Sequence, residues 1–244
     1  MKNIALKIAY NGRNFSGYQY QPGLRTVEAH LLDALEFLVG QRTKLYSAGR
    51  TDKGVHALGQ VANFRSNIKV QTVMIPQVMN CYLPDDVSVI QAKEVPMDFH
   101  ARYWAKTKHY RYTIYNNRQR NGFFFDRVTH IHHPLDHKAM ERALKQVEGA
   151  HDFRSFMGRD SSQEETLRGL DRVRVHRQGP FIYLDFYGRS FLKNMVRILV
   201  GTAIEVGQGK RSEEGIYEAL MAKDRTLAGT TAPAGGLTLM RIYY

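Results

Sequence analysis

The first residues whose types and spacing suggest chemistry lie in SAGRTDKGVHALGQVANF, residues 47 to 64. This stretch sets one acid, Asp52, between Arg50 and Lys53, and Gly54 follows. A carboxylate can attack an electrophilic carbon, or stabilise positive charge that develops there, as glycosidase acids do. Asp-Lys-Gly is also a turn signal, because Asp bonds its own backbone and Gly accepts positive φ. This segment alone leaves both interpretations open.

An acid in a closed site needs a positive partner. Burial alone raises the pKa of an acid by up to ~3 to 5 pH units, whereas an adjacent cation lowers it by ~1 to 3. Cations are abundant here, since 35 Lys and Arg against 23 Asp and Glu leave a formal charge of +12 and a pI near 9.8. Such a balance favours acidic partners, above all nucleic acid.

The sequence disfavours cofactor and metal chemistry. It has no Walker loop, no dinucleotide fingerprint and no metal-ligand cluster. The single cysteine, Cys81, excludes an internal disulfide and any multi-thiolate site, and we expect it to be a buried, inert thiol. In HIHH, residues 130 to 133, strand alternation would divide the histidines between two faces. We therefore expect neither a cofactor nor a metal.

Membrane insertion and export are also disfavoured. No apolar run reaches the roughly 18 residues that a spanning helix needs. The start, MKNIALKIAYNG, alternates like a strand and does not resemble a signal peptide. We expect a soluble, cytoplasmic protein.

The elements that must position these residues alternate between strands and helices. A helix beginning after Thr26, with Gly40 just past its end, fits the apolar spacing of the first half. Strands are expected at residues 3 to 10, 60 to 65, 87 to 95, 108 to 116 and 236 to 244, and a hairpin at 171 to 188 that turns at 178 to 180. Further helices are expected within 73 to 86, at 136 to 149, and at 190 to 209 with Ser190 as the cap.

This order predicts an α+β class. Strands and helices cluster without regular βαβ spacing, which favours largely antiparallel sheets. Regular patterning lapses near residues 97 to 106, and each half repeats a strand, helix and strand order. We therefore predict two similar domains, 1–103 with the Asp loop and 104–244, joined across a central basic cleft with helices on the outer faces.

Four stretches resemble one known family. GRTDKGVHALGQVANF is similar to the active-site segment of the tRNA pseudouridine synthase A family. FSGYQYQP, KHYRYTIYN, and FLKNMVRILVG followed by KDRTLAGTTAPAGGLTLMRIYY match further family segments in the same order, so the resemblance runs from residue 4 to the end. Two departures are Tyr18, where many members carry Trp, and Lys53, which fills a variable position.

The resemblance implies an isomerase that converts uridine to pseudouridine at positions 38 to 40 of the tRNA anticodon stem-loop, without a cofactor. The reaction breaks the bond from ribose C1′ to N1, turns the uracil within the site, and rejoins it through C5. The partners that the resemblance implies are tRNA and a second copy of the chain, because family members are homodimers.

The resemblance also implies roles for four residues. Asp52 would be the nucleophile, with Arg197 from the second half as its positive partner. Tyr110 would stack on or hydrogen-bond the target uracil, and Arg50 would fill the space of a flipped base or hold a phosphate. Without the resemblance, Arg197 is equally an exposed helix arginine, Tyr110 a core aromatic like Tyr112, and Arg50 a solvated turn residue.

A stem uridine must leave the stack before its C1′ and C5 can be reached, which requires a few kcal/mol. Contacts between basic side chains and phosphates can offset this cost and would make tRNA binding depend on salt. Each basic side chain that could make such a contact is equally a solvated surface cation. The candidates are Arg102, Lys106, Lys108, Arg111, Arg118 and Arg120. Three chemical routes stay open for Asp52: addition to C1′, addition to C6, or removal of a ribose proton to give a glycal.

Two other classes of protein remain. A non-catalytic RNA-binding module would keep the basic face and the aromatics but would not need Asp52. An Asp-metal nuclease would need clustered carboxylates and magnesium. The adjacent pair Asp85-Asp86 lies in a loop led by proline, where a turn or cap role is expected instead.

Overall fold

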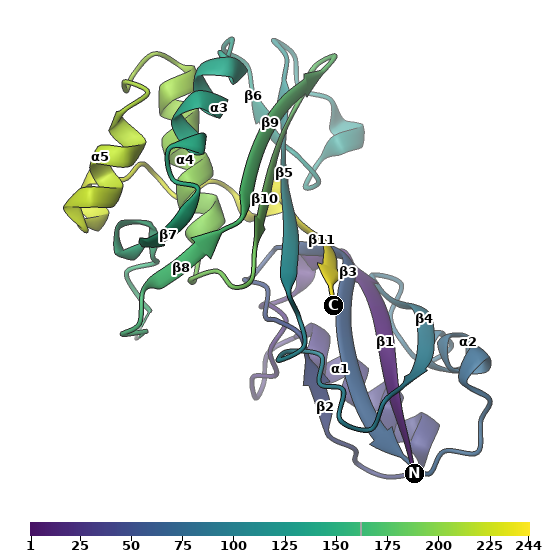
Figure 1. Cartoon of the computed structure of the whole chain (residues 1–244). Helices are drawn as coiled ribbons and strands as arrows, with labels where there is room; N and C mark the ends of the chain where they lie inside the picture. Colours follow the sequence, from purple (N-terminus) through teal and green to yellow (C-terminus); the bar gives the residue numbers. More distant parts are fainter. Residues whose placement is uncertain (162) are drawn as a thin grey trace. The chain divides into compact units, whose positions relative to one another are not determined.

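The computed structural model describes residues 1–161 and 163–244, which form two compact units. Unit 1 is Met1–Lys106 with Leu239–Tyr244, and unit 2 is Thr107–Thr238. Both units combine helices with mainly antiparallel strands (Figure 1). The α+β class that the sequence predicts is therefore confirmed.

The expected domains 1–103 and 104–244 stay a prediction, because a compact unit is not by itself an independently folding domain. The last strand, expected in the second half, lies mostly in unit 1. It pairs there with a strand of the first half. Hydrophobic periodicity does not reveal such a pairing, because it shows which side chains of a strand share a face but not which strand lies beside it.

The sheet of unit 1 has the strand order β4-β1-β3-β11. Alternation in β1 buries Ile4, Leu6 and Ile8 completely, which confirms the period of two read from the sequence. β1 pairs antiparallel with β3 and β4, and the short β2 pairs with β3. The strands are β1 (Lys2–Tyr10), β2 (Leu45–Ser47), β3 (His56–Ser66), β4 (Val87–Val95) and β11 (Leu237–Tyr243).

Unit 1 has two α-helices, α1 (Val27–Val39) and α2 (Ile75–Asn80). Gly40 ends α1 at φ +81°, as predicted. Thr26 is the residue before α1, but its hydroxyl makes no cap hydrogen bond, so its expected capping role is wrong. The first N–H groups of the helix have other partners, because those of Val27 and Glu28 donate to the Gly17 and Tyr18 carbonyls, at 3.3 and 2.8 Å.

The main sheet of unit 2 has the order β5-β10-β9, with all three strands antiparallel. β9 and β10 form the expected hairpin, which turns at Gly179 with φ +57°. β6 pairs parallel with β5, while β7 and β8 form a separate two-stranded sheet. The strands are β5 (Thr107–Asn116), β6 (Thr129–Ile131), β7 (Gly149–Asp152), β8 (Leu167–Leu170), β9 (Arg172–Gln178) and β10 (Phe181–Gly188).

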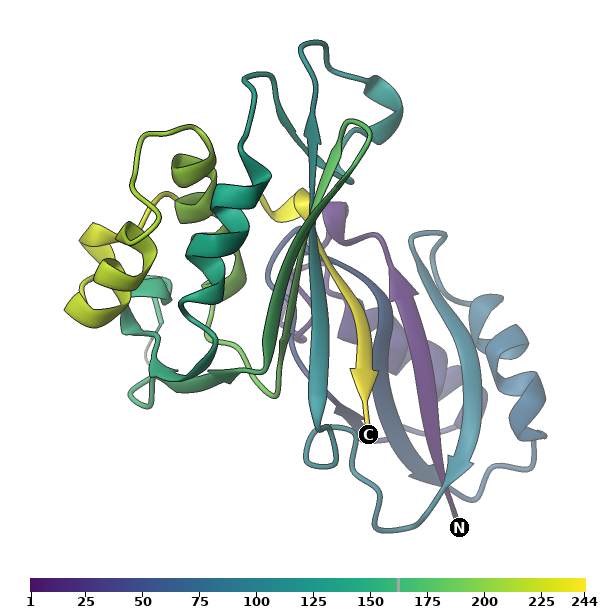
Figure 2. The same ribbon diagram turned by 45° about the horizontal axis from the view of Figure 1, so that its top comes forward.

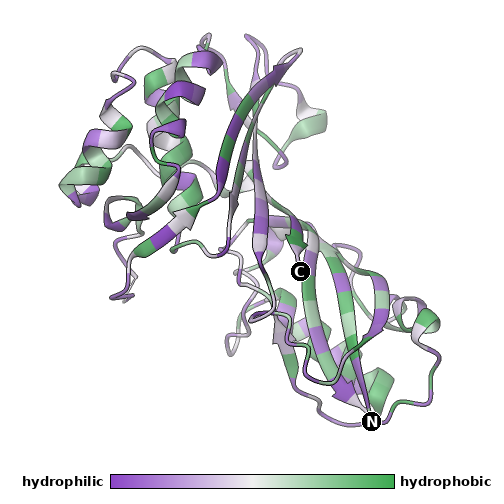
Figure 3. Cartoon of the chain, viewed as in Figure 1, coloured by the Kyte–Doolittle hydropathy of each residue, from purple (hydrophilic) through white to green (hydrophobic). Residues whose placement is uncertain are grey.

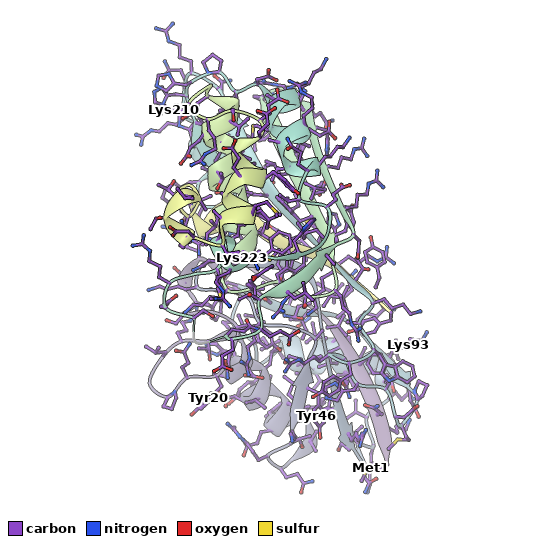
Figure 4. All side chains as sticks on the ribbon, turned by 60° about the vertical axis from the view of Figure 1, so that its left-hand side comes forward. Met1, Tyr20, Tyr46, Lys93, Lys210 and Lys223 are labelled. Carbon is purple, nitrogen blue, oxygen red and sulfur yellow. The ribbon has the colours of Figure 1, made fainter. Side chains whose placement is uncertain are left out.

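Three helices, α3 (His137–Lys145), α4 (Met195–Gly207) and α5 (Gly215–Ala222), lie on one side of this sheet in both views (Figure 1, Figure 2). Tyr112 and Phe186 of the strands are buried on the core side, and α4 is mostly buried. Charged side chains extend outward from this unit, for example Lys210 and Lys223 (Figure 4).

Two predicted helix boundaries are wrong. α3 ends at Lys145 and not at residue 149, because residues 149–152 pair as β7. α4 begins at Met195 and not after Ser190, because Asn194 takes a left-handed conformation at φ +60° and interrupts any earlier helical turn. The short helix α5 was not predicted, and its N-cap residue, Glu214, makes no side-chain cap hydrogen bond.

Six short 3-10 helices complete the described elements: η1 (Gly12–Asn14), η2 (Thr72–Met74), η3 (Gly122–Phe124), η4 (Arg154–Phe156), η5 (Arg225–Leu227) and η6 (Ala234–Gly236). Cys81 is exposed at the end of α2, so the expectation of a buried thiol is wrong. Its position after the last helical residue places the side chain at the surface. Within residues 1–161 and 163–244, no helix has the length and apolar character to cross a membrane.

Candidate active site

Asp52 lies between β2 and β3 in a segment, residues 48–55, that we call the Asp loop. The expected turn is present, because Val55 N–H donates to the Asp52 carbonyl at 3.1 Å and Gly54 takes φ +79°. Asp52 is half-buried and Arg50 is exposed. The turn and the catalytic interpretation are therefore compatible, since the turn fixes the backbone from which the Asp52 side chain extends.

A second loop, residues 11–26, which we call the Gly17 loop, packs against the Asp loop within unit 1. Gly54 N–H donates to the Phe15 carbonyl at 3.3 Å, and Tyr18 N–H donates to the Thr51 carbonyl at 3.1 Å. Tyr20, labelled in Figure 4, extends from the Gly17 loop and is exposed. FSGYQYQP and GRTDKGVH, two separate stretches of sequence, thus form one local structure.

Buried polar side chains brace the Asp loop from beneath. The Tyr10 hydroxyl lies 2.8 Å from Thr51 Oγ1, and Gln60 Nε2 donates to the Gly49 carbonyl at 2.8 Å. The Tyr18 hydroxyl lies 2.6 Å from Ser47 Oγ. Burial raises the pKa of Tyr10 above its ordinary value, so that hydroxyl stays a neutral partner. Sequence reasoning missed these supports, because no local pattern marks them.

Gly17 sets the distance between the two loops, and replacing it tests their contact. A Cβ at Gly17 would lie 3.1 Å from the Thr51 carbonyl oxygen, at φ +102°. Gly23, in the same loop at φ +73°, has nothing within 4 Å of such a Cβ. We expect Gly17→Ala to reduce the unfolding free energy of unit 1 by about 1–3 kcal/mol more than Gly23→Ala, because only the first adds a steric clash to the backbone strain.

Urea unfolding followed by the fluorescence of Trp104, the single tryptophan and a residue of unit 1, measures this difference. Equal losses for the two variants would show that the close approach of the loops contributes nothing.

Tyr110 lies on β5 in unit 2 and is 7% exposed. Its ring meets the Phe191 ring edge to face, with centroids 5.1 Å apart. Tyr112, two residues along the strand, is fully buried and its hydroxyl donates to the Pro233 carbonyl at 2.9 Å. Tyr112 is therefore the core aromatic that the sequence predicts, while Tyr110 lies beside the segment that leads into α4.

Arg197 lies in the first turn of α4 and is half-buried. Its Nε donates to the Ala232 carbonyl and its Nη1 to Asn194 Oδ1, both at 2.8 Å. These two contacts fix the plane of the guanidinium group. Arg197 is therefore not the solvated helix arginine that was the alternative interpretation. Sequence reasoning missed Asn194, because a left-handed asparagine leaves no mark on periodicity.

The segment around Ala232 is itself held close to α4. A Cβ at Gly201 would lie 1.7 Å from the Thr230 carbonyl oxygen, so only glycine permits this approach. Gly229 N–H donates to Thr202 Oγ1 at 2.9 Å. FLKNMVRILVG and AGTTAPAGG, both part of the resemblance, are therefore packed together within unit 2.

Asp185 of β10 binds the residues on both sides of Tyr110. His109 Nε2 donates to Asp185 Oδ1 at 2.6 Å, and Arg111 Nε donates to the same oxygen at 2.8 Å. Burial alone would raise the pKa of the Asp185 carboxyl, but the hydrogen bonds from His109 and Arg111 outweigh it and hold the pKa below its ordinary value. Arg111, which the sequence analysis offered as a phosphate contact, thus has an internal partner.

The described residues contain no group of three or more His, Cys, Asp or Glu placed to hold a metal ion. Asp86 of the adjacent acidic pair accepts two hydrogen bonds from Arg25, at 2.8 and 2.9 Å. His130 Nε2 lies 2.8 Å from the Asn117 carbonyl oxygen and donates to it. These side chains have structural partners of their own.

Comparison with known proteins identifies similar chains over the whole length. A family model described as tRNA pseudouridine synthase matches residues 7–104 and 143–244, which include Asp52 and Arg197. The tRNA pseudouridine synthase A of Moorella thermoacetica is 43% identical over 246 aligned residues, covering 100% of both chains. That of Geobacillus kaustophilus is 44% identical over 100% of this chain and 95% of the relative.

Among solved structures, a chain of the crystal structure of a Cbf5-Nop10-Gar1 complex aligns with a TM-score of 0.42 and 11% identity. The alignment covers 96% of this chain and 57% of that chain. A likeness of this strength supports no argument about the site. Asp52 and Arg50 lie in unit 1, whereas Tyr110 and Arg197 lie in unit 2. The family model matches segments that contain all of them except Tyr110, and the two aligned relatives cover the whole chain.

Proposed function

This chain belongs to the tRNA pseudouridine synthase family, and from that premise we propose that it isomerises uridine to pseudouridine at positions 38 to 40 of the tRNA anticodon stem-loop, without a cofactor. The observation that carries the proposal is the match of the family model to residues 7–104 and 143–244. The braced Asp loop supports it, because a catalytic carboxylate needs a fixed backbone.

In the proposed reaction Asp52 acts as nucleophile on a uridine that has left the stack. The bond from C1′ to N1 breaks, the uracil turns, and a bond from C1′ to C5 forms. C5 loses its proton to solvent and N1 gains one, so no electron, phosphate or external group is consumed. Addition of Asp52 to C1′, its addition to C6, and a glycal route all satisfy this balance.

Three further residues have proposed roles. Arg197 would keep Asp52 ionised, and its two fixed hydrogen bonds support a role that needs a set orientation. Tyr110 would stack on or hydrogen-bond the target uracil, for which an aromatic ring suits any base. Arg50, which is exposed, would fill the space of the flipped base or hold a phosphate.

A chromatographic assay tests the proposed function. Unmodified tRNA is incubated with the protein in EDTA, digested to nucleosides and analysed for pseudouridine. Pseudouridine at positions 38 to 40 is the expected product. Cleaved tRNA that depends on magnesium would instead indicate the nuclease, and bound but unchanged tRNA would indicate the RNA-binding module.

We expect Arg197→Gln to lower kcat by roughly 100-fold, as the loss of one preorganised charged donor does elsewhere. Because a nearby cation lowers an acid's pKa by ~1–3 pH units, the acidic limb of the kcat/KM profile should move to higher pH in this variant. Arg142→Gln is the control, since Arg142 forms an exposed pair with Glu213. An unmoved acidic limb in Arg197→Gln would argue against Arg197 as the partner of Asp52.

Family similarity also leads us to propose a cytoplasmic homodimer, in which one tRNA touches both subunits. The net charge of +12 supports a polyanionic partner for each copy. The mass of the protein in solution, measured by light scattering, decides between monomer and dimer.

A further inference from the structure

Between β5 and β6, residues 117–128 form a segment that we call the η3 loop. It contains the short helix η3, leaves the end of β5 and folds back beside that strand to begin β6, whose Thr129 pairs with Ile114 (Figure 1, Figure 2). Tyr110 and Asn116, the last residue of β5, are separated by six residues of strand, or roughly 20 Å. Phe124 packs on Tyr115, five residues along β5 from Tyr110 and on the opposite face of the strand, so we assign its neighbour Phe123 to a base other than the one that Tyr110 meets.

The η3 loop has a built conformation. Phe124 packs against Phe181 and Tyr115, with ring centroids 5.0 and 5.6 Å apart. Asn121 begins η3, and its side-chain oxygen accepts the Phe123 N–H at 3.0 Å. Phe124 thus anchors the loop to the sheet, whereas the adjacent side chain, Phe123, is not packed on the sheet.

Phe123 is that neighbour, and its side chain is 86% exposed. Its ring is nearly perpendicular to the Phe124 ring, with centroids 5.3 Å apart, and most of its surface is open to solvent. Figure 3 shows this apolar stretch between hydrophilic segments of the loop. An aromatic ring held in this way can stack on a nucleobase at a small cost in conformational entropy.

The same loop is strongly cationic. Arg118, Arg120 and Arg127 are all exposed, and Asp126 is the only acid among residues 117–128. Across the part of the chain that the structure describes, no ion pair joins these three arginines to an acid. An exposed ring among unneutralised guanidinium groups matches single-stranded nucleic acid, which offers bases for stacking and phosphates for the cations.

We propose that the η3 loop is a second tRNA contact, in which Phe123 stacks on an unpaired base other than the target uridine and the three arginines bind neighbouring phosphates. This inference rests on the proposed function, because it takes tRNA as the substrate. A second copy of this chain fits the loop less well, since each copy carries +12 and the loop itself is cationic. The contact would hold the substrate without taking part in the chemistry.

Equilibrium binding of dye-labelled, unmodified tRNA tests the stacking contact. We expect Phe123→Ala to raise the Kd for tRNA by about 5- to 100-fold, because losing one stack between a base and an aromatic ring weakens binding by about this factor. Phe123→Trp should restore wild-type binding, and kcat at saturating tRNA should not change in either variant. Phe37→Ala is the matched control, because Phe37 is also an exposed aromatic, 61% exposed, on α1.

The contribution of the three arginines is measured separately, by the dependence of tRNA binding on salt concentration. Each phosphate contact contributes about 0.7–0.9 to the slope of log K against log salt. Replacing Arg118, Arg120 and Arg127 together with Gln should therefore reduce the magnitude of that slope by about 2–3. Exposed side chains can be changed in this way with little risk to folding.

Two results would overturn the inference: tRNA binding by Phe123→Ala that equals the wild type, or a change in its mass by light scattering, which would identify a protein interface. Neither result depends on catalysis. If wild-type protein binds tRNA but forms no pseudouridine, the proposed function fails while the binding comparison still decides the role of the η3 loop.

Discussion

Asp52→Asn should fold and bind tRNA as the wild type does, yet form pseudouridine at least about a thousand-fold more slowly. Removal of a nucleophile has effects of this size or larger in other enzymes. Asparagine matches the shape of aspartate but cannot carry its charge, so it neither attacks C1′ nor stabilises positive charge there. The turn at residues 52–55 uses backbone atoms and Gly54, which the substitution leaves in place.

The measurement is a pair: tRNA affinity by anisotropy and pseudouridine by nucleoside chromatography. Asp85→Asn is the control, because Asp85 is an exposed acid of the same unit with no proposed role in the reaction. Undiminished product from Asp52→Asn would remove Asp52 as the nucleophile. Equal binding with no product from either wild type or variant would favour the RNA-binding module.

Asp185→Ala should destabilise unit 2 by about 3–5 kcal/mol, the usual consequence of removing one partner of a buried ion pair. Asp185 is 2% exposed, and its loss leaves His109 and Arg111 without their acceptor. Asp185, His109 and Arg111 all lie on β5 or β10, so the loss of stability is expected in these two strands. Hydrogen exchange in peptides from β5 and β10 measures it directly.

Asp171→Ala provides the matched control. Asp171 is exposed and accepts a hydrogen bond from Thr107 Oγ1 at 2.9 Å, so its loss should change stability by about 1 kcal/mol or less. Similar exchange in the two variants would show that the buried contact contributes no more than a surface one.

The Asp185 contact also makes unit 2 sensitive to acid. The pKa of Asp185 is lower in the folded chain than in the unfolded chain, so the unfolded state binds more protons as pH falls. The stabilisation is complete above the unfolded pKa of about 3.9 and disappears as pH falls through the folded pKa. Asp185→Ala should lack this part of the acid sensitivity.

Much of the fold could be predicted, because periodicity reports burial directly. Alternation in β1, the glycine after α1 and the Gly-Pro turn of the β9–β10 hairpin each have one local cause. The turn at Asp-Lys-Gly was also predicted from its residues and is confirmed, whereas the catalytic role of Asp52 follows from the family resemblance and stays a prediction.

Contacts between distant residues could not be predicted. Thr26 lost its capping role to carbonyls of the Gly17 loop, and α4 starts late because Asn194 is left-handed. Asp185 appears in the sequence as one acid in an apolar strand, with nothing to show that His109 and Arg111 are its partners. Contacts with another loop, contacts across strands and the backbone conformation of a single residue are not encoded in hydrophobic periodicity.

The most direct test of the central claim uses tRNA labelled with tritium at uridine C5, in EDTA and without nucleotide. Formation of the bond from C1′ to C5 expels the C5 hydrogen, so release of tritium to water reports isomerisation itself. Wild-type protein should release tritium from uridines at positions 38 to 40, and Asp52→Asn should release almost none. No release by the wild type, or equal release by the variant, would contradict the account.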